Sequence, residues 1–377
     1  MSLRLIHISD LHLGKKMSMV PIEEDQRHML RTVSELAEKE SADAVLIAGD
    51  IYDSTTPANE SYNLLSGFLS DLAEKGIKVF AVAGNHDSSD KISYGSELFR
   101  VSGIHMAGSY SGSLEAITLK GRDGTEADIF MLPFVKPSIV RNLHPDAKID
   151  SYEDAVRTAV GTADLSGDRK KVLIAHQYVT SSGGETKRAE SESFVGGLDN
   201  VDASIFDAFD YVALGHIHMK QCVGRETVRY CGTPLKYSKS EAEGEKTITI
   251  VDIGDTVSIR EVPIVPLREV RIIRGPLERL IDAAKECGGS DDFIFAELTE
   301  PALDAMQRLR EVYPNTLNVT VVMPETGNGG VIESDEVFTE STDVRKEFEK
   351  FFRERTGTEL TDSQKGIIDA KFEEVGL

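Results

Sequence analysis

The sequence has few cysteines and no long apolar run. Its three cysteines, Cys222, Cys231 and Cys287, form no CxxC pair and do not suggest a disulfide framework. We expect these cysteines to be small buried hydrophobic residues or incidental surface thiols. No apolar stretch approaches the roughly 20 residues of a membrane span, and residues 1–7 have the pattern of a strand instead of a signal peptide. We therefore expect a cytoplasmic protein without a membrane partner.

Basic residues are scarce relative to acidic ones. The chain has 42 Lys and Arg against 64 Asp and Glu, a formal net charge of -22, and a pI near 4.9. Phosphate backbones attract clustered cations, so this balance argues against strong nonspecific DNA binding by the chain alone. Short basic groups such as 169–171 and 187–188 are more typical of solvated faces. Metal ions can reverse the charge locally at an acidic site, and a partner subunit can supply further cations.

The length of 377 residues predicts more than one domain. Apolar strands and amphipathic helices alternate over the first 85 residues, which predicts a parallel sheet with right-handed crossovers. Short strands between 104 and 135 predict a hairpin or a second sheet stacked on the first, and residues 181–197 predict a loop long enough to lie over a site. Prolines mark a linker near 262–267. We predict domains over 1–262 and 267–324, the second a small cap of βαβαβ order, followed by a joint and helical tail over 325–377.

Five predicted strands end on residues of metal-binding types. The clearest is the apolar run 43–50, which stops on Gly49 and Asp50. Open α/β sheets bind ligands beyond the carboxyl ends of their strands, so we expect these side chains to meet. A single histidine after a strand is usually structural, as we expect for His7, His28, His105 and His144, but five strand ends share the pattern. Their residues are Asp10 and His12, Asp50 and Asp53, Asn85 and His86, His176, and His216 and His218.

The chemistry of these side chains favours a pair of metal ions. Imidazole, carboxylate and amide oxygen are borderline to hard ligands, suited to Mn, Fe or Zn, and no cysteine lies among them. The ligands are too many for one ion. Two ions roughly 3.5 to 4 Å apart that share a carboxylate would use them all, and such a pair activates water and binds a phosphoryl group.

The five motifs, taken in order, resemble those of the calcineurin-like metallophosphoesterases: Asp10-x-His12, Gly49-Asp50-x-x-Asp53, Gly84-Asn85-His86-Asp87, His176, and Gly215-His216-x-His218. The resemblance implies an α/β fold in which two sheets and two helical layers form a four-layer αββα sandwich. Over residues 1 to about 255 the chain is most similar to nuclease subunits that act in DNA repair with a coiled-coil ABC-type ATPase. From 265 onward the likeness is one of layout.

This resemblance implies a role for each strand-end residue. One metal would be held by Asp10, His12, Asp50 and His218, and the second by Asp50, Asn85, His176 and His216, with Mn²⁺ expected at both. His86 would stabilise the transition state or protonate the leaving oxygen, held in orientation by Asp53. Nuclease relatives from archaea and eukaryotes often carry His at the position of Asp53. Asp87 is equally well explained as a turn residue.

We therefore expect a Mn-dependent DNA exonuclease and endonuclease that works with an ATPase partner and forms a homodimer. A phosphoesterase of the same fold acting on small nucleotides or phosphoproteins is the alternative, favoured by the acidic charge, and a catalytically inactive scaffold is a third. The tail residues Phe348, Phe351 and Phe352 share one helical face. They would bind the ATPase or pack on their own chain.

Overall fold

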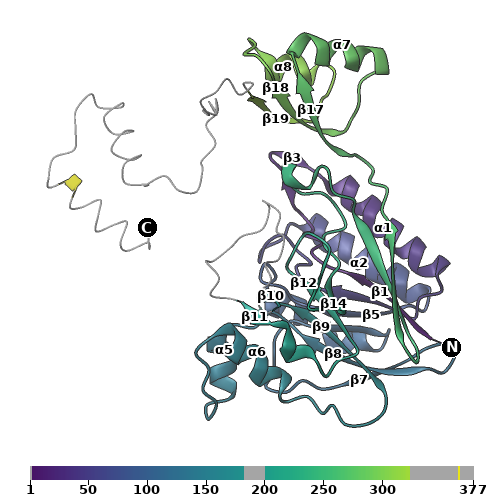
Figure 1. Ribbon diagram of the computed structural model, residues 1–377. Coiled ribbons are helices and arrows are strands. Elements are labelled where there is room, and N and C mark those ends of the chain that lie inside the picture. The colour runs from purple at the N-terminus through teal and green to yellow at the C-terminus, as the bar shows by residue number, and fades with distance from the viewer. Residues whose placement is uncertain (1, 182–199, 323–363, 366–377) are drawn as a thin grey trace. The chain divides into compact units, whose positions relative to one another are not determined.

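The computed structural model describes residues 2–181, 200–322 and 364–365 (Figure 1). The chain divides into two units, Met1–Val319 and Thr320–Leu377, and almost all described residues belong to the first. The predicted loop over 181–197, apart from Ser181, and the phenylalanines of the predicted tail lie outside the described residues. Among the residues that the structure describes, no helix combines the length and apolar character that a membrane span requires.

The first sheet has six strands in the order β16-β15-β1-β4-β5-β6. Four of them are parallel, as the alternation of strands and helices predicts: β1 (Leu3–Ile8), β4 (Ala44–Ala48), β5 (Lys78–Val82) and β6 (Ile104–Ala107). The antiparallel strands β15 (Thr247–Ile253) and β16 (Val257–Pro263) extend the sheet beyond β1. Strands from both ends of the first 263 residues therefore meet in one sheet.

The second sheet also has six strands, in the order β13-β14-β12-β9-β8-β7. They are β13 (Gln221–Val223), β14 (Arg225–Tyr230), β12 (Tyr211–Gly215), β9 (Lys170–His176), β8 (Glu126–Leu132) and β7 (Ile117–Lys120). One buried cluster joins the two sheets, with Leu46 and Phe80 from the first and Val172 and Tyr211 from the second. The stacked second sheet predicted from the short strands is thus present.

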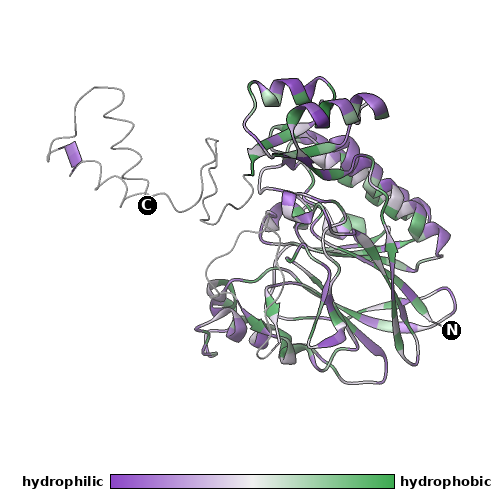
Figure 2. Cartoon of the chain, turned by 45° about the horizontal axis from the view of Figure 1, so that its top comes forward, coloured by the Kyte–Doolittle hydropathy of each residue, from purple (hydrophilic) through white to green (hydrophobic). Residues whose placement is uncertain are grey.

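Helices cover the outer face of each sheet. α1 (Glu23–Lys39) and α2 (Asn59–Glu74) pack on the first, and α5 (Pro137–Leu143) and α6 (Tyr152–Val160) pack on the second (Figure 1). Hydrophilic and hydrophobic residues alternate along the helices, as in amphipathic helices that bury one face (Figure 2). The predicted four-layer αββα sandwich is confirmed.

Some local elements differ from the sequence prediction. The linker was predicted to begin near residue 262, but β16 continues through Pro263, which pairs with Thr247 of β15. Proline is tolerated there because β16 is an edge strand and needs no outward donor. The short helices α3 (Ser89–Ser93) and α4 (Ser96–Arg100) were not predicted, since five residues are too few to show a helical period.

A third sheet follows the linker. β17 (Val270–Gly275), β18 (Phe293–Leu298) and β19 (Thr316–Val321) lie in that order, with α7 (Leu277–Cys287) and α8 (Ala305–Arg310) as connections. The order of elements is the predicted βαβαβ. The second helix begins only at Ala305, because Asp304 before it has a left-handed backbone conformation with φ of 52°.

Candidate metal centre

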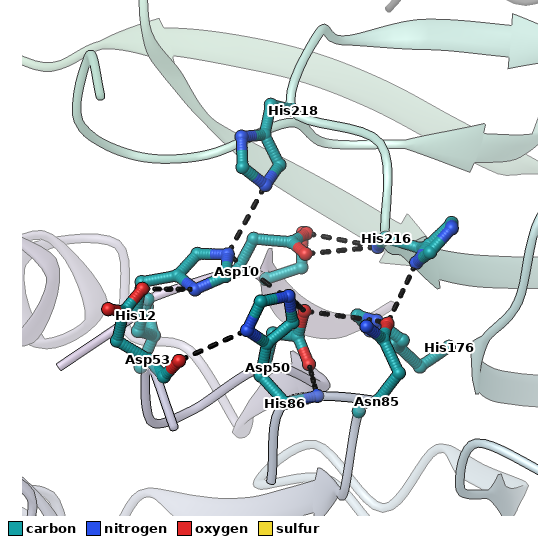
Figure 3. Close-up of polar contacts among 12 residues, drawn as sticks. Asp10, His12, Asp50, Asp53, Asn85, His86, His176, His216 and His218 are labelled. Atoms are coloured by element: carbon teal, nitrogen blue, oxygen red, sulfur yellow. Dashed lines mark hydrogen bonds and ion pairs between the residues drawn. The ribbon is translucent and has the colours of Figure 1, made fainter. Parts of the chain in front are cut away.

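The nine predicted side chains come together where the strands of the two sheets end (Figure 3). His12 Nε2 lies 3.2 Å from His218 Nε2, and His176 Nε2 lies 3.4 Å from Asp50 Oδ2. Asn85 Oδ1 lies 3.0 Å from His176 Nε2 and 2.9 Å from a ring nitrogen of His216. Residues from β1, β4 and β5 of the first sheet thus face residues from β9 and β12 of the second.

The backbone is strained at the centre itself. Asp10, His12, Asp50 and His216 have φ of 54°, 43°, 46° and 104°, a region that L-residues with side chains rarely adopt. Such conformations persist only where surrounding contacts hold them, and they concentrate at functional sites. Here two main-chain hydrogen bonds tie the loops, from Asp10 N to Gly49 O and from His12 N to Asp50 O, each 3.0 Å. These strained conformations lower the stability of the fold, and they direct the four side chains toward one point.

Glycines in the motifs allow the two sheets to approach this closely. A Cβ on Gly49 would lie 2.2 Å from His176 Nδ1, and one on Gly84 would lie 2.1 Å from Asp50 Oδ1. A Cβ on Gly215 would lie 1.8 Å from the main-chain oxygen of Ala48. These contacts are too short for any side chain, so the three glycines are required by packing around the centre.

Among the described residues the donor atoms form three overlapping groups. Asp10, His12 and His218 make one, Asp10, Asp50 and His176 make another, and His12, Asp53 and His86 make the third, with the donors of each group within 4.8 Å of one another. We call the set Asp10, His12, Asp50 and His218 site 1, and the set Asp50, Asn85, His176 and His216 site 2. Oxygen and imidazole donors of this kind suit divalent cations, so the residues fit the predicted pair of ions.

The electrostatics of the centre favour bound cations. Asp10 and Asp50 are buried carboxylates; burial, followed by the negative charge of Asp50, raises the pKa of Asp10. Burial opposes protonation of His176, but the charge and hydrogen bond of Asp50, the charge of Asp10 and the hydrogen bond with Ala48 O together outweigh it and raise the pKa of His176 to about 9. Burial also lowers the pKa of His218, which keeps that imidazole neutral as a ligand must be. The carboxylates thus attract positive charge, which metal ions supply.

The structure brings Asp53 and His86 into contact, as the resemblance implies, and shows which group of Asp53 makes the contact. His86 Nδ1 lies 3.0 Å from the main-chain carbonyl oxygen of Asp53 and not from its carboxylate. The carboxylate Oδ1 instead lies 3.2 Å from His12 Nδ1, at an angle bent from an ideal hydrogen bond, and 2.9 Å from Lys15 Nζ. Burial raises the pKa of Asp53, but these two partners outweigh it and lower that pKa to about 2. Asp53 therefore supports a candidate metal ligand through its side chain.

Asp87 has the structural role that was one of its two interpretations. Its buried carboxylate accepts hydrogen bonds from the main-chain nitrogens of Ile51, Tyr52 and Gly84, at 3.0, 2.8 and 2.9 Å. Burial and the nearby charge of Asp50 raise the pKa of Asp87 to about 6. The residue ties the loop after β4 to the loop after β5, and so fixes two strand ends that carry candidate ligands.

Several supporting residues carry no sign in the sequence. Gln26 Nε2 donates to the carbonyl of His12 at 2.7 Å, and Lys246 Nζ donates to the carbonyl of His218 at 3.1 Å. Tyr237 donates its hydroxyl to the carbonyl of Leu11 at 2.6 Å. Gln26 lies in α1, Lys246 lies just before β15, and Tyr237 lies in a loop. No sequence motif marks any of the three. Lys15 adjoins the first motif and forms a short basic pair with Lys16.

Comparisons with known proteins identify the family. Residues 3–220 match the model of the calcineurin-like phosphoesterases. The chain belongs to this family. Residues 266–356 match the type 5 capsule protein repressor C-terminal domain, also called SbcD_C. The chain is 30% identical over 372 residues to the SbcD subunit of the nuclease SbcCD from Staphylococcus epidermidis, covering 97% of each protein. It is therefore an SbcD-type phosphoesterase, a metal-dependent phosphodiester hydrolase.

Two solved structures are also similar to this phosphoesterase. GAP50, the anchor in the inner membrane complex of Plasmodium, is 12% identical with a TM-score of 0.40, over 87% of this chain and 99% of the other. A dimetal phosphatase from Danio rerio is 11% identical with a TM-score of 0.40, over 70% of this chain and 98% of the other.

Proposed function

We propose that this phosphoesterase is the Mn²⁺-dependent DNA nuclease subunit of a complex with an SbcC-type coiled-coil ABC ATPase. In this proposal it acts in the cytoplasm as a double-strand exonuclease and a single-strand or hairpin endonuclease in DNA repair, recombination and replication. The observation that carries the proposal is the convergence of both sites on Asp50, whose Oδ2 lies 3.4 Å from His176 and 3.9 Å from His12. Similarity to a protein named as a nuclease subunit supports the choice of DNA.

The residues would divide the work of phosphodiester hydrolysis. Asp10, His12 and His218 would hold one ion and Asn85, His176 and His216 the other, with Asp50 between them. Bound ions at such a centre activate water and neutralise the charge that develops on the phosphoryl group. The contacts around these ligands hold them rigidly, which keeps the centre organised before substrate binds.

His86 is the residue for proton transfer to the leaving oxygen. The contact of Nδ1 with the carbonyl oxygen of Asp53 orients the ring. Because a carbonyl oxygen can only accept a hydrogen bond, Nδ1 carries the proton in this contact. Its Nε2 lies 4.0 Å from Asp50 Oδ2 and faces the centre. When the ring is protonated, Nε2–H can donate to the sugar oxygen that leaves, which is a poor leaving group without a proton.

The test is turnover of linear duplex DNA by the purified chain with Mn²⁺. We expect degradation from DNA ends, and loss of degradation in Asp50→Ala and His86→Gln with the circular dichroism spectrum kept. DNA degradation that persists in both variants would overturn the proposal. A bound-metal measurement on the wild type tests the scaffold alternative, which predicts none.

A phosphoesterase of small nucleotides or phosphoproteins is the second candidate, because the net charge of -22 opposes binding to a phosphate backbone. The two candidates are separated by comparing turnover of duplex DNA, cyclic nucleotides and phosphopeptides under the same Mn²⁺ concentration. Faster turnover of the small substrates would favour the second candidate.

We also propose a homodimer, on the evidence of an exposed apolar surface. Tyr94, Leu98 and Val101 on and beside α4 are 83%, 77% and 89% exposed, an unusual exposure for large apolar side chains. Light scattering should report a dimer for the wild type and a monomer for Leu98→Glu. Leu303→Glu, at a residue 84% exposed near α8, is the matched control and should remain a dimer. A dimer in both variants would place the interface elsewhere.

The partner proposal concerns residues 325–377. Co-purification with a coiled-coil ABC ATPase should occur for the full chain and fail when these residues are deleted, while hydrolysis of a small phosphodiester continues. Retained co-purification would show that the predicted tail does not carry the contact.

A further inference from the structure

One segment, residues 233–246, lies between site 1 and the third sheet, and we call it the bridging segment. At site 1 it touches the main chain of both histidine-bearing loops. Thr233 N donates to the carbonyl of His218 at 3.1 Å, and the Tyr237 hydroxyl donates to the carbonyl of Leu11, next to His12, at 2.6 Å. The segment therefore helps to fix the positions of two candidate ligands of site 1.

A buried ion pair stiffens the bridging segment. Lys246 Nζ lies 2.7 Å from Glu241 Oε1 and donates to Thr233 Oγ1 at 2.6 Å and to the carbonyl of His218 at 3.1 Å. Glu241, 3% exposed, also accepts from Tyr237 N at 3.1 Å. These contacts form one continuous network from Tyr237 N through Glu241 and Lys246 to the carbonyl of His218.

The other side of the segment contacts the third sheet and the linker that leads to it. Lys239 Nζ lies 2.9 Å from Glu297 of β18, a residue only 7% exposed. Lys236 Nζ lies 2.7 Å from Glu269 at the start of the third sheet, and it also donates to the carbonyl of Ala242 at 2.7 Å. Two ion pairs thus attach the segment to elements beyond the sandwich.

A second route leads from the linker to His12. Arg268 forms an ion pair with the buried Asp25 of α1, and its guanidinium lies 4.9 Å from the centre of the Phe293 ring of β18. The next residue of α1, Gln26, donates to the carbonyl of His12 at 2.7 Å and accepts from Gly14 N at 3.0 Å. Each histidine of site 1 is therefore connected to the third sheet through a set of buried and half-buried side chains.

Site 2 is supported from within the sandwich. His176 Nδ1 lies 2.8 Å from the main-chain carbonyl oxygen of Ala48 in β4. The loop that carries Asn85 is tied by Asp87 to the loop after β4. A cavity of about 420 Å³, lined by Met17, Lys236, Arg268 and Phe293 among others, lies where the linker and the bridging segment meet. None of the site 2 residues lines this cavity.

We propose that the bridging segment and Arg268 are positioning elements that make the metal affinity of site 1, and not that of site 2, depend on the placement of the third sheet. The proposal rests on the two-metal centre of the proposed function. Its consequence is that one ion of the pair is gained or lost when the third sheet is displaced, whereas the other stays. Supporting groups behind metal ligands have this effect because they fix ligand orientation, and their loss lowers metal affinity about 10- to 100-fold.

The test uses the full chain and Mn²⁺ binding measured by electron paramagnetic resonance and equilibrium dialysis. Lys239→Met/Arg268→Met removes the two cations that reach Glu297 and Asp25. The control Arg169→Met/Lys170→Met removes two cations that pair, at 2.9 Å each, with Asp128 and Asp210 at the far end of the second sheet. Lys239 and Lys170 are matched in exposure, at 35% and 34%. Both double variants change the net charge equally.

Each site is then measured alone. In a His216→Ala background we expect the remaining ion to occupy site 1, and we expect Lys239→Met/Arg268→Met to weaken its binding by about 10-fold or more. In a His218→Ala background we expect the remaining ion to occupy site 2, with less than about a 2-fold change. The control should change both by less than about 2-fold. Circular dichroism and thermal melting establish that each variant is folded.

The outcomes separate the inference from its premise. Equal weakening of both sites, or no weakening of site 1, would overturn the inference while the two-metal centre stands. A wild-type chain that binds fewer than two Mn²⁺ ions would overturn the centre, and the inference with it.

Discussion

His86 is held by the main-chain carbonyl of Asp53, whose carboxylate lies instead 3.2 Å from Nδ1 of His12. Asp53 thus contacts two histidines of the centre through two different groups, its main-chain carbonyl and its carboxylate. The backbone orients the proposed proton donor, and the side chain supports a candidate ligand of site 1. Substitutions can separate these two roles, because only the side chain changes.

We predict that Asp53→Asn weakens metal binding and leaves the proton-transfer step in place. The neutral amide attracts Lys15 and the N–H of His12 more weakly than the carboxylate does, so Mn²⁺ affinity at site 1 should fall by about 10-fold. The carbonyl that orients His86 remains. Mn²⁺ titration and a pH–rate profile at saturating metal check this, and a change confined to the pH profile would contradict it.

We predict the opposite result for His86→Gln. Turnover should fall by about 10²- to 10⁴-fold, because a positioned proton donor contributes a factor of this size. Mn²⁺ affinity should stay within about 2-fold, since His86 belongs to neither set of proposed ligands. Comparison of kcat with the Mn²⁺ binding isotherm is the measurement, and a large loss of metal affinity would place His86 among the ligands.

A methyl group at Gly84 should disrupt the centre. Its carbon would lie 2.1 Å from Asp50 Oδ1, so Gly84→Ala must displace the shared carboxylate, at a cost of about 1 to 3 kcal/mol in unfolding free energy. Both Mn²⁺ ions should bind more weakly. Gly67→Ala is the matched control in α2, where a Cβ meets open space, and should raise stability by about 0.5 to 1 kcal/mol. Urea unfolding and Mn²⁺ titration measure both effects, and normal Mn²⁺ binding by Gly84→Ala would contradict the packing argument.

His7 should make the metal-free protein sensitive to acid. Burial lowers the pKa of His7 to about 3, while its ring contacts the Tyr211 hydroxyl at 2.8 Å. Between pH 6.5 and about 3 the unfolded chain binds a proton that the folded chain rejects, so stability falls as the pH drops. From pH 6.5 to 5 this residue contributes a loss of about 2 kcal/mol.

His7→Gln removes this titration, although its lost contacts lower stability at neutral pH. Urea unfolding at pH 7, 6 and 5 should therefore show a shallower decline for the variant than for the wild type. Equal slopes for the two proteins would refute the assignment of the acid sensitivity to His7.

The sequence was sufficient for the large elements and for the set of side chains that come together at the candidate centre. Buried strands such as β4 and amphipathic helices such as α1 show their periods over many residues, so their positions could be read within a residue or two. The nine site residues could be found because each follows an apolar strand, and parallel strands end at one edge of a sheet. The short helices α3 and α4 and the true end of β16 were missed, since five-residue helices and edge strands have little periodicity.

What each site residue contacts was decided only by the tertiary structure. Asp53 was expected to orient His86, and the structure shows that its main-chain carbonyl makes the contact, a group that no side-chain pattern in the sequence indicates. The partners of Gln26 and Lys246 are main-chain carbonyls, which every residue carries and which no sequence pattern marks. The sequence by itself therefore determined which side chains meet, through strand periodicity and motif spacing. Only the packing of the sheets, loops and bridging segment decided which atoms hold them in place.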